Sequence, residues 1–307
     1  MNSFWKNKKV LIIGGTGFIG KNFVARLTEL QANLTFTSRK KVILKNQSVL
    51  KVDPVLIEDF DAINEEFDVL INCAALDGNG NFKKQFANDV CDVNSRISLN
   101  ILNFSKKRNI RDVVLLSSAE VYSGVKKKKV GEDDLKTTSL KHPSGYQVSK
   151  LFLEILSNFY SINNPEMRIY LPRPSYVYGP GDKYVDAKNS RLIPLLINNI
   201  KNGEKITFFG GRSRKINLIY AKDLVNAILN MVEKKKTGPL NITSTELLSV
   251  SKLIQKITEV IGKKAKVTFE KTNLRPGFLM NNAELLKIKD DFTPFEEGIL
   301  ETIKKTS

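Results

Sequence analysis

The sequence has few of the residues that build disulfide frameworks or histidine-based sites. Its 307 residues include two cysteines, Cys73 and Cys91, and a single histidine, His142. Two cysteines give no disulfide framework, and Cys73 lies in an apolar, strand-like run, so we expect a reducing, cytoplasmic compartment. One histidine argues against a histidine-rich metal site and against a Ser-His-Asp triad. We therefore predict no metal.

Long hydrophobic runs are also missing. No segment approaches the roughly 18 consecutive apolar residues that a membrane span needs. The first apolar run is short and is interrupted by glycines, unlike a signal peptide. We expect no membrane span and a chain long enough to bury a sizeable core, either as one α/β unit or as a large domain with a small one.

Acidic residues are outnumbered, and the formal net charge is +17. The lysines occur in scattered clusters, such as 126–129 and 234–236, and not in one stripe interleaved with aromatic residues. This pattern favours a solvated lysine-rich surface over a nucleic-acid-binding face. A basic balance also helps to attract a polyanionic substrate such as a nucleotide sugar.

A glycine-rich turn joins the first predicted strand to the first predicted helix. Residues 10–13 are apolar and mostly β-branched, and residues 18–30 are amphipathic at helical spacing. Between them Gly14, Gly17 and Gly20 follow the spacing G-x-x-G-x-x-G. Such a turn brings backbone N–H groups to a pyrophosphate at a helix N-terminus, whereas a tight turn without a ligand is the alternative. The strand before and the helix after favour dinucleotide binding.

The second predicted strand, residues 33–38, ends in Ser38-Arg39-Lys40, and no acidic residue occurs from 37 to 41. In a dinucleotide fold this strand end meets the adenosine ribose, where an acidic residue holds a free 2′-hydroxyl and an arginine suits a 2′-phosphate. Arg39 therefore predicts NADP, with NAD as the alternative cofactor. A solvated Arg-Lys-Lys turn is the other interpretation.

Strands and helices alternate along most of the chain. Further strands are expected at 49–52, 67–75, 113–116 and 168–171, and helices at 89–107 and, after a polar loop at 123–143, at 144–160. Such alternation is typical of βαβ units. It predicts an α/β fold with a Rossmann-type, doubly wound parallel sheet.

The alternation loosens after residue 178, so we expect a smaller C-terminal substrate-binding lobe. The predicted Rossmann domain covers 1–178, and 216–245 return to it through a helix at 220–233 and a strand at 239–243. The lobe is then formed by 179–215 and 246–307, with a helix at 248–262.

Tyr146 and Lys150 lie four residues apart in the helix expected at 144–160, so their side chains share a face. An ammonium beside a phenol favours the phenolate and lowers the pKa of the tyrosine toward working pH. Ser118 follows the strand expected at 113–116, at the edge where parallel strands bind ligands. Its hydroxyl can hydrogen-bond the oxygen that Tyr146 protonates or deprotonates. Two helix-surface residues and a capping serine are the alternative interpretation.

A series of motifs resembles the extended short-chain dehydrogenase/reductases, in particular the NAD-dependent epimerase/dehydratase family. In order along the chain they are GGTGFIG, NCAA, SSAEVY, YQVSK, RPSYVYGPGD and Arg275-Pro276-Gly277. The resemblance covers about residues 8 to 300. Most members of this family act on nucleotide-activated sugars, so the resemblance implies a nucleotide-sugar substrate.

The resemblance also implies roles for single residues. Ser118, Tyr146 and Lys150 match the catalytic trio, and Lys150 also matches the residue that holds the nicotinamide ribose. Asp53 matches the family's adenine contact, and Asn94 matches a buried asparagine of a helix. The residues expected to bind the cofactor are Gly14, Thr16, Gly17, Phe18, Ile19, Gly20, Arg39, Asp53, Pro54, Ala74, Ala75, Tyr146, Lys150 and Ser175. The residues expected to bind the substrate are Ser118, Ala119, Glu120, Tyr176, Arg191, Arg214 and Arg275.

Departures from the family pattern concern the substrate. The family's asparagine in R-P-x-N-V-Y-G is Tyr176 here, and the arginine usual before D-F-I-H-V-x-D falls on Ile216. In a strand, residue 214 shares a face with 216, so Arg214 can reach the same diphosphate. Arg275 matches the second diphosphate-binding arginine.

Two of the family's reactions lack a group in this chain. Glu120 resembles the base of the 4,6-dehydratases, but residue 119 is alanine, so their acid has no match. Arg191 and Ala119 stand where the GDP-fucose synthases place a histidine and a cysteine, so both groups of their epimerisation are missing. Hydride transfer at a carbonyl or carbinol remains.

The sequence thus predicts an NAD(P)-dependent oxidoreductase acting on a nucleotide-activated sugar, with a 4-keto reductase as the first choice. A 4-epimerase with tightly bound NAD is the second. A nucleic-acid-binding or redox-sensing Rossmann protein without turnover is the alternative from another class. The resemblance also implies a homodimer through the helices expected at 89–107 and 144–160.

Overall fold

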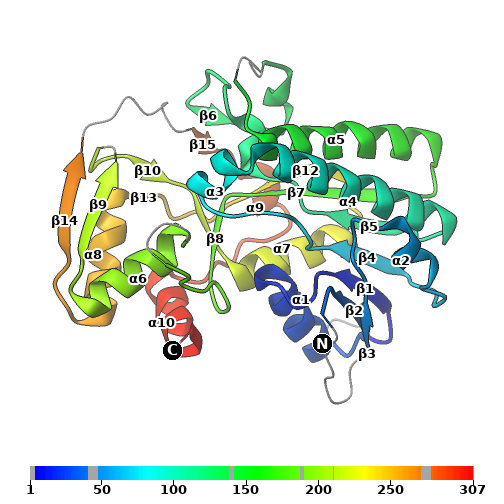
Figure 1. Cartoon of the computed structure of the whole chain (residues 1–307), viewed down its shortest axis with the longest axis horizontal. Helices are drawn as coiled ribbons and strands as arrows, with labels where there is room; N and C mark the ends of the chain where they lie inside the picture. Colours follow the sequence, from blue (N-terminus) through cyan, green and yellow to red (C-terminus); the bar gives the residue numbers. More distant parts are fainter. Residues whose placement is uncertain are drawn as a thin grey trace.

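The computed structural model describes residues 4–40, 48–137, 142–186, 190–209, 211–270 and 278–306. Its centre is a sheet of seven strands in which every neighbouring pair is parallel, so the predicted doubly wound α/β fold is confirmed (Figure 1). In spatial order the strands are β12 (Gly238–Ile242), β7 (Arg168–Pro174), β5 (Asp112–Leu115), β4 (Val69–Asn72), β1 (Lys9–Ile13), β2 (Asn33–Ser38) and β3 (Ser48–Lys51).

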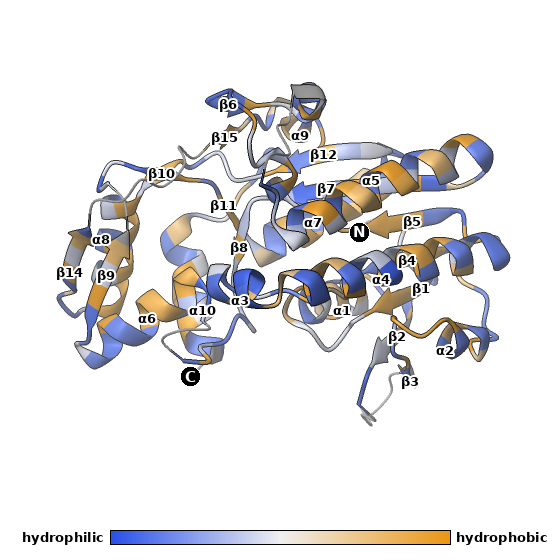
Figure 2. Ribbon diagram, turned by 45° about the horizontal axis from the view of Figure 1, so that its top comes forward, coloured by the Kyte–Doolittle hydropathy of each residue, from blue (hydrophilic) through white to orange (hydrophobic). Residues whose placement is uncertain are grey.

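The apolar residues of β1 divide between two cores, one on each face of the sheet. Val10 and Ile12 pack with α1 (Phe18–Glu29) and α7 (Ala221–Glu233). Leu11 and Ile13 pack with helices of the opposite face, namely α2 (Ile57–Asp61), α4 (Ala87–Lys107) and α5 (Gly145–Asn163). A strand buried on both faces needs a continuous apolar run, and β1 and β5 are mostly hydrophobic in Figure 2.

A smaller lobe lies beside the sheet, on the left in Figure 1. Its core joins three helices to short two-stranded pairings. The helices are α6 (Leu192–Asn202), α8 (Val250–Ile261) and α10 (Phe295–Thr306). The pairings are β8 (Tyr176–Tyr178) with β11 (Leu218–Tyr220), β9 (Lys205–Phe209) with β14 (Lys266–Glu270), and β10 (Lys215–Ile216) with β13 (Leu248–Ser249).

Part of the C-terminal chain returns to the large sheet. β15 (Leu279–Met280) pairs with β6 (Lys129–Val130) over a small core that includes Val121 and Tyr122 of the 3₁₀ helix η1 (Ala119–Tyr122). α9 (Ala283–Leu286) follows, and its Leu285 joins the core of α1 and α7. The C-terminal chain therefore contributes to both parts of the molecule.

Some elements differ from the expectation. The stretch expected to be a polar loop, 123–143, contains β6 and the 3₁₀ helix η2 (Glu132–Thr137). α3 (Gly80–Gln85) was not expected, because its six residues GNFKKQ carry no amphipathic pattern. Asn79 caps this helix by accepting a hydrogen bond from the Phe82 backbone N–H at 3.0 Å.

Candidate active site

The glycine turn leaves the carboxyl end of β1 beside the end of β4. Gly14 has φ +77°, a conformation that favours glycine, and a Cβ at Gly14 would stand 3.0 Å from the Ala74 backbone nitrogen. A Cβ at Gly20 would stand only 2.2 Å from the Gly14 carbonyl oxygen, so the first turn of α1 packs directly on the glycine turn. Gly17 is exposed at the N-cap of α1, whose free N–H groups suit a phosphate.

Other residues expected to bind the cofactor surround this turn at different depths. Phe18 and Ile19 are half-buried against the core, Thr16 and Ala74 are half-buried, and Ala75 is exposed. Along β2, Thr37 accepts a hydrogen bond from the Gly14 N–H at 3.1 Å.

The end of β2 carries Arg39, which is exposed. Nearby, the Val52 N–H donates to the Ser38 carbonyl at 3.1 Å, which brings Asp53 and Pro54 alongside the end of β2. The Asp53 carboxylate accepts from the Val55 N–H at 3.1 Å, and Pro54 is buried. Arg39 and Asp53 thus flank the same strand end, where a dinucleotide fold receives the adenosine.

These residues fit a dinucleotide. The turn is built from residues without large side chains, and its backbone is closely packed on one side and exposed on the other. Ser175, between β7 and β8, is buried, and its Oγ has no hydrogen-bond partner among the described residues. A buried hydroxyl without a partner is costly unless a ligand satisfies it, so this atom also suits a bound cofactor.

Ser118, Tyr146 and Lys150 come together at the carboxyl end of β5. Ser118 caps η1 by accepting from the Glu120 N–H at 3.1 Å, and its side chain also hydrogen-bonds Tyr146. Tyr146 and Lys150 lie on α5 and are buried, and the Lys150 ammonium donates to the Leu116 carbonyl at 2.6 Å. The serine is therefore both a helix cap and a partner of the phenol.

The expected lowering of the tyrosine pKa was wrong for the chain by itself. Burial, followed by the charges of Asp77 and Glu120, raises the pKa of Tyr146 well above its ordinary value, and the Ser118 hydrogen bond only partly opposes this. Burial also lowers the pKa of Lys150 to about 8. The phenol is consequently held in its protonated form.

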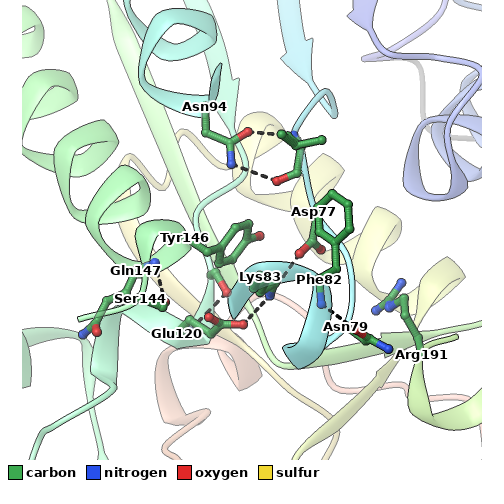
Figure 3. A network of polar contacts seen from close by, with 12 residues as sticks. Asp77, Asn79, Phe82, Lys83, Asn94, Glu120, Ser144, Tyr146, Gln147 and Arg191 are labelled. Carbon is green, nitrogen blue, oxygen red and sulfur yellow. Dashed lines mark hydrogen bonds and ion pairs between the residues drawn. The ribbon is translucent and has the colours of Figure 1, made fainter. Parts of the chain in front are cut away.

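A lysine that sequence reasoning missed lies closest to the phenol ring. The Lys83 ammonium is 3.8 Å from the centre of the Tyr146 ring, whereas the Lys150 ammonium is 5.4 Å from it. Lys83 pairs with Asp77 at 3.0 Å and also with Glu120 (Figure 3). Its position depends on α3, and no sequence motif marks that helix.

Asn94 holds the segment that leads from β4 to α3. Its amide accepts from the Leu76 N–H at 2.7 Å and donates to the Leu76 carbonyl at 3.0 Å (Figure 3). This double hydrogen bond fixes the chain immediately before Asp77.

The residues expected to bind the substrate are only partly brought together. Ala119 and Glu120 follow Ser118 in η1. Arg191 directly precedes α6 and its guanidinium lies 5.1 Å from the centre of the Tyr176 ring, and the Tyr176 hydroxyl accepts from the Leu192 N–H. Arg214 is exposed just before β10, and Arg275 lies outside the described residues.

A parallel sheet with a glycine turn and a Ser-Tyr-Lys group at the carboxyl ends of its strands is the arrangement of the short-chain dehydrogenase/reductases. The chain belongs to the NAD-dependent epimerase/dehydratase family, whose model matches residues 10–243. This confirms the resemblance inferred from the motifs.

Individual relatives agree with this assignment. The chain is 28% identical to a dTDP-4-dehydro-6-deoxy-D-allose reductase of a Streptomyces species, over 98% of this chain and 96% of the relative. Its fold is similar to that of an epimerase from Methanothermobacter thermautotrophicus, with a TM-score of 0.86 and 22% identity over 98% of this chain and 92% of that chain. It is also similar to the UDP-glucose 4-epimerase of Thermus thermophilus in complex with NAD, with a TM-score of 0.80 and 19% identity over 97% and 98% of the two chains.

Two kinds of feature are absent from the described residues. None of their helices is both long and apolar enough to cross a membrane. No group of three or more histidine, cysteine, aspartate or glutamate side chains within the described ranges is arranged to hold a metal ion.

Proposed function

We propose that the chain is an NAD(P)-dependent reductase that acts on a nucleotide-activated sugar. The proposed target is a keto group, with C4 as the first choice of position. The observation that carries this proposal is the contact of Ser118 with Tyr146 at the sheet edge where the glycine turn also lies. The name of the Streptomyces relative, a reductase of a dTDP-linked 4-keto sugar, supports the same substrate class.

Each member of the trio Ser118, Tyr146 and Lys150 has its own role in the proposed reduction. Tyr146, protonated and buried, donates its proton to the carbonyl oxygen of the substrate, while Ser118 hydrogen-bonds that oxygen. Lys150, fixed by the Leu116 carbonyl, lies one helical turn from Tyr146 and is assigned the nicotinamide ribose and stabilisation of the developing phenolate. When bound, the reduced cofactor supplies the hydride for the carbonyl carbon.

Two observations favour reduction over the other reactions of the family. Glu120 is paired with Lys83, so its carboxylate is engaged and is not a free base for removing a proton from carbon. The raised pKa of Tyr146 suits a proton donor, whereas a 4-epimerase must first use this residue as a proton acceptor. The 4-epimerase with tightly bound NAD remains the second candidate, because the trio serves both reactions.

NADP is the proposed cofactor, held at the glycine turn with Arg39 at the 2′-phosphate. The exposed guanidinium at the end of β2, with no acidic residue beside it in the sequence, supports this choice. Arg191, Arg214 and Arg275 are proposed to contact the substrate diphosphate. The division into a Rossmann domain (1–178 with 216–245) and a substrate-binding lobe (179–215 with 246–307), and the cytoplasmic location, stay predictions.

A homodimer is proposed through α4 and α5. An apolar stripe, defined by Val148, Phe152, Ile155, Phe159 and Ile162, runs along the outer face of α5. Ile155, Phe159 and Ile162 are 71%, 60% and 68% exposed, and Leu99 of α4 adds to the exposed apolar surface. A contiguous exposed stripe of this kind marks an interaction surface.

Replacing Tyr146 by phenylalanine tests the reductase directly. With NADPH and a dTDP-linked 4-keto-6-deoxy sugar, Tyr146→Phe is expected to lower kcat by about 10²–10⁴-fold, because it removes the proton donor. Cofactor binding, followed by nicotinamide fluorescence, should persist. The matched control is Tyr160→Phe, which removes a phenol from the same helix, where it hydrogen-bonds Asn103. Undiminished turnover in Tyr146→Phe would remove this tyrosine from its role.

A further inference from the structure

Lys83 is held in a defined position over the phenol ring of Tyr146. Its ammonium lies 3.8 Å from the ring centre, and its side chain is only 13% exposed. The ammonium forms an ion pair at 3.0 Å with Asp77, which lies in the segment before α3, and a second ion pair with Glu120 of η1 (Figure 3). A lysine side chain costs conformational entropy to fix, so three partners from three elements define one place for this charge.

The helix that carries Lys83 is itself tied to the site. Asn79 caps α3, and its side-chain amide also donates to the Ser190 carbonyl at 3.4 Å, next to Arg191. Asn94 fixes Leu76 by two hydrogen bonds just before Asp77. The Lys83 cluster, defined as Asp77, Lys83 and Glu120, therefore does not depend on surface contacts alone.

Tyr146 lies among charges of both signs, and Lys83 is paired with both of the nearby carboxylates. Tyr146 is faced by Asp77 and Glu120, by Lys83 above the ring, by Lys150 from its own helix and by Arg191 from the lobe. The two carboxylates disfavour loss of the phenol proton, and Lys83 pairs with both of them. Burial opposes the charged form of Lys83, but Asp77 and Glu120 more than offset this and raise its pKa.

We propose that Lys83 is a positioning residue that neutralises Asp77 and Glu120 beside Tyr146, and so sets how readily the phenol releases its proton. Without Lys83, two unpaired carboxylates would face the buried phenol, and phenolate formation would become harder. The ammonium over the ring also interacts favourably with its electrons, and more strongly as the phenol becomes negative. The consequence for catalysis rests on the proposed function, in which Tyr146 is the proton donor.

The protonation of Tyr146 can be measured without any substrate. The protein, with its eight tyrosines, is labelled with 3-fluorotyrosine, whose phenol is more acidic than that of tyrosine. The ¹⁹F resonance of residue 146 is assigned by its loss in Tyr146→Phe and followed against pH. Lys83→Met keeps a long, unbranched side chain and removes the positive charge. In this variant the midpoint of the residue 146 titration is expected to rise by about 1 pH unit or more. Lys83→Arg should stay near the parent value.

Two further variants make the test specific. Lys84→Met removes an exposed lysine from the same helix and should leave the midpoint unchanged. Glu120→Gln removes one carboxylate and should lower the midpoint. A midpoint in Lys83→Met equal to that of the parent protein, or a midpoint in Glu120→Gln that does not fall, would overturn the proposal.

Kinetics then separate this inference from the proposed function. If the chain is a reductase, Lys83→Met should move the alkaline limit of kcat upward together with the ¹⁹F midpoint, and lower kcat by about 10-fold with a smaller change in KM. A shifted midpoint in a protein that reduces no keto sugar would contradict the proposed function and leave the role of Lys83 standing. A reductase whose alkaline limit stays fixed in Lys83→Met would overturn the role of Lys83 alone.

Discussion

The guanidinium of Arg191 lies 5.2 Å from the centre of the Phe18 ring. Phe18 is the first residue of α1, directly after Gly17, and Arg191 directly precedes α6 of the lobe. Arg191 also donates to the Val177 carbonyl at 2.9 Å. The lobe therefore places a half-buried positive charge beside the glycine turn, between the residues expected to bind the cofactor and those expected to bind the substrate.

Arg191→Met should weaken binding of the nucleotide sugar. Methionine retains apolar contact with Phe18 and Tyr176 but cannot bind a phosphate, and the loss of one charge-assisted contact is expected to raise KM by about 10-fold or more. The change in kcat should be smaller. Arg96→Met, at an exposed position on α4, is the control. A KM equal to that of the parent protein would exclude Arg191 as a substrate contact.

Gly20→Ala should destabilise the protein and weaken cofactor binding together. The added methyl would meet the Gly14 carbonyl oxygen at 2.2 Å and the Gly15 Cα at 2.8 Å, and both belong to the backbone of the turn. We expect a loss of about 1–3 kcal/mol in the free energy of unfolding, as for other overpacked sites. Gly80→Ala, where a Cβ meets nothing within 4 Å, should not lose stability. Denaturant unfolding and cofactor titration check both variants, and equal behaviour of the two would contradict the expectation.

The large sheet could be predicted from the sequence because its strands and helices carry strong periodic patterns. The second strand was expected at 33–38 and occurs there, and the first helix was expected at 18–30 and spans Phe18–Glu29. The pairings of the lobe could not be predicted in the same way. β10 and β13 have two residues each, which is too short for any periodicity, and only tertiary packing defines them.

The candidate site also contains residues that the sequence predicts and residues that only the folded structure brings together. The glycine turn and the pair Tyr146 and Lys150 have fixed local spacings, so they could be predicted as site residues from the sequence. Lys83 could not be found, because its partners Asp77 and Glu120 lie 6 and 37 residues away in the sequence. The tyrosine pKa was misjudged for a related reason. Its value depends on burial and on Asp77 and Glu120, and neither can be read from a spacing of four residues.

Asp182→Asn should stabilise the protein above pH 6 and not below pH 4. Asp182 is buried, and burial raises its pKa to about 6, although Arg191 partly opposes this. The folded protein therefore binds this proton more tightly than the unfolded chain, in which the pKa is about 4. Ionisation of Asp182 therefore destabilises the folded protein increasingly as pH rises from about 4 to 6. Above pH 6 the full destabilisation is present.

The asparagine variant removes that cost, but it also loses the weak ion pair with Arg191 at 3.4 Å. We expect a net gain of about 1–2 kcal/mol in the free energy of unfolding at pH 7.5 and no gain at pH 3.5. Denaturant unfolding at the two pH values measures this, with the exposed Asp92→Asn as the control. A gain of the same size at both pH values would show that titration of Asp182 is not the cause.

Ile155→Glu should convert the proposed dimer into monomers. Ile155 is the most exposed residue of the apolar stripe on α5, and a buried, unpaired carboxylate in a dimer interface is strongly unfavourable. Ser161→Glu places the same charge on another exposed face of α5 and should leave the dimer intact. Sedimentation velocity distinguishes the two states. A parent protein that sediments as a monomer at micromolar concentration would refute the dimer itself.

Arg39→Asp should exchange the cofactor preference. Arg39 is exposed at the end of β2, where a guanidinium can pair with a 2′-phosphate and a carboxylate can accept from a free 2′-hydroxyl. The parent protein is expected to bind NADPH at least about 10-fold more tightly than NADH, and Arg39→Asp to reverse this order. Arg111→Asp, at an exposed position just before β5, is the control. Equal affinities for NADPH and NADH in the parent protein would remove the 2′-phosphate contact, and the case for an epimerase with retained NAD would then become stronger.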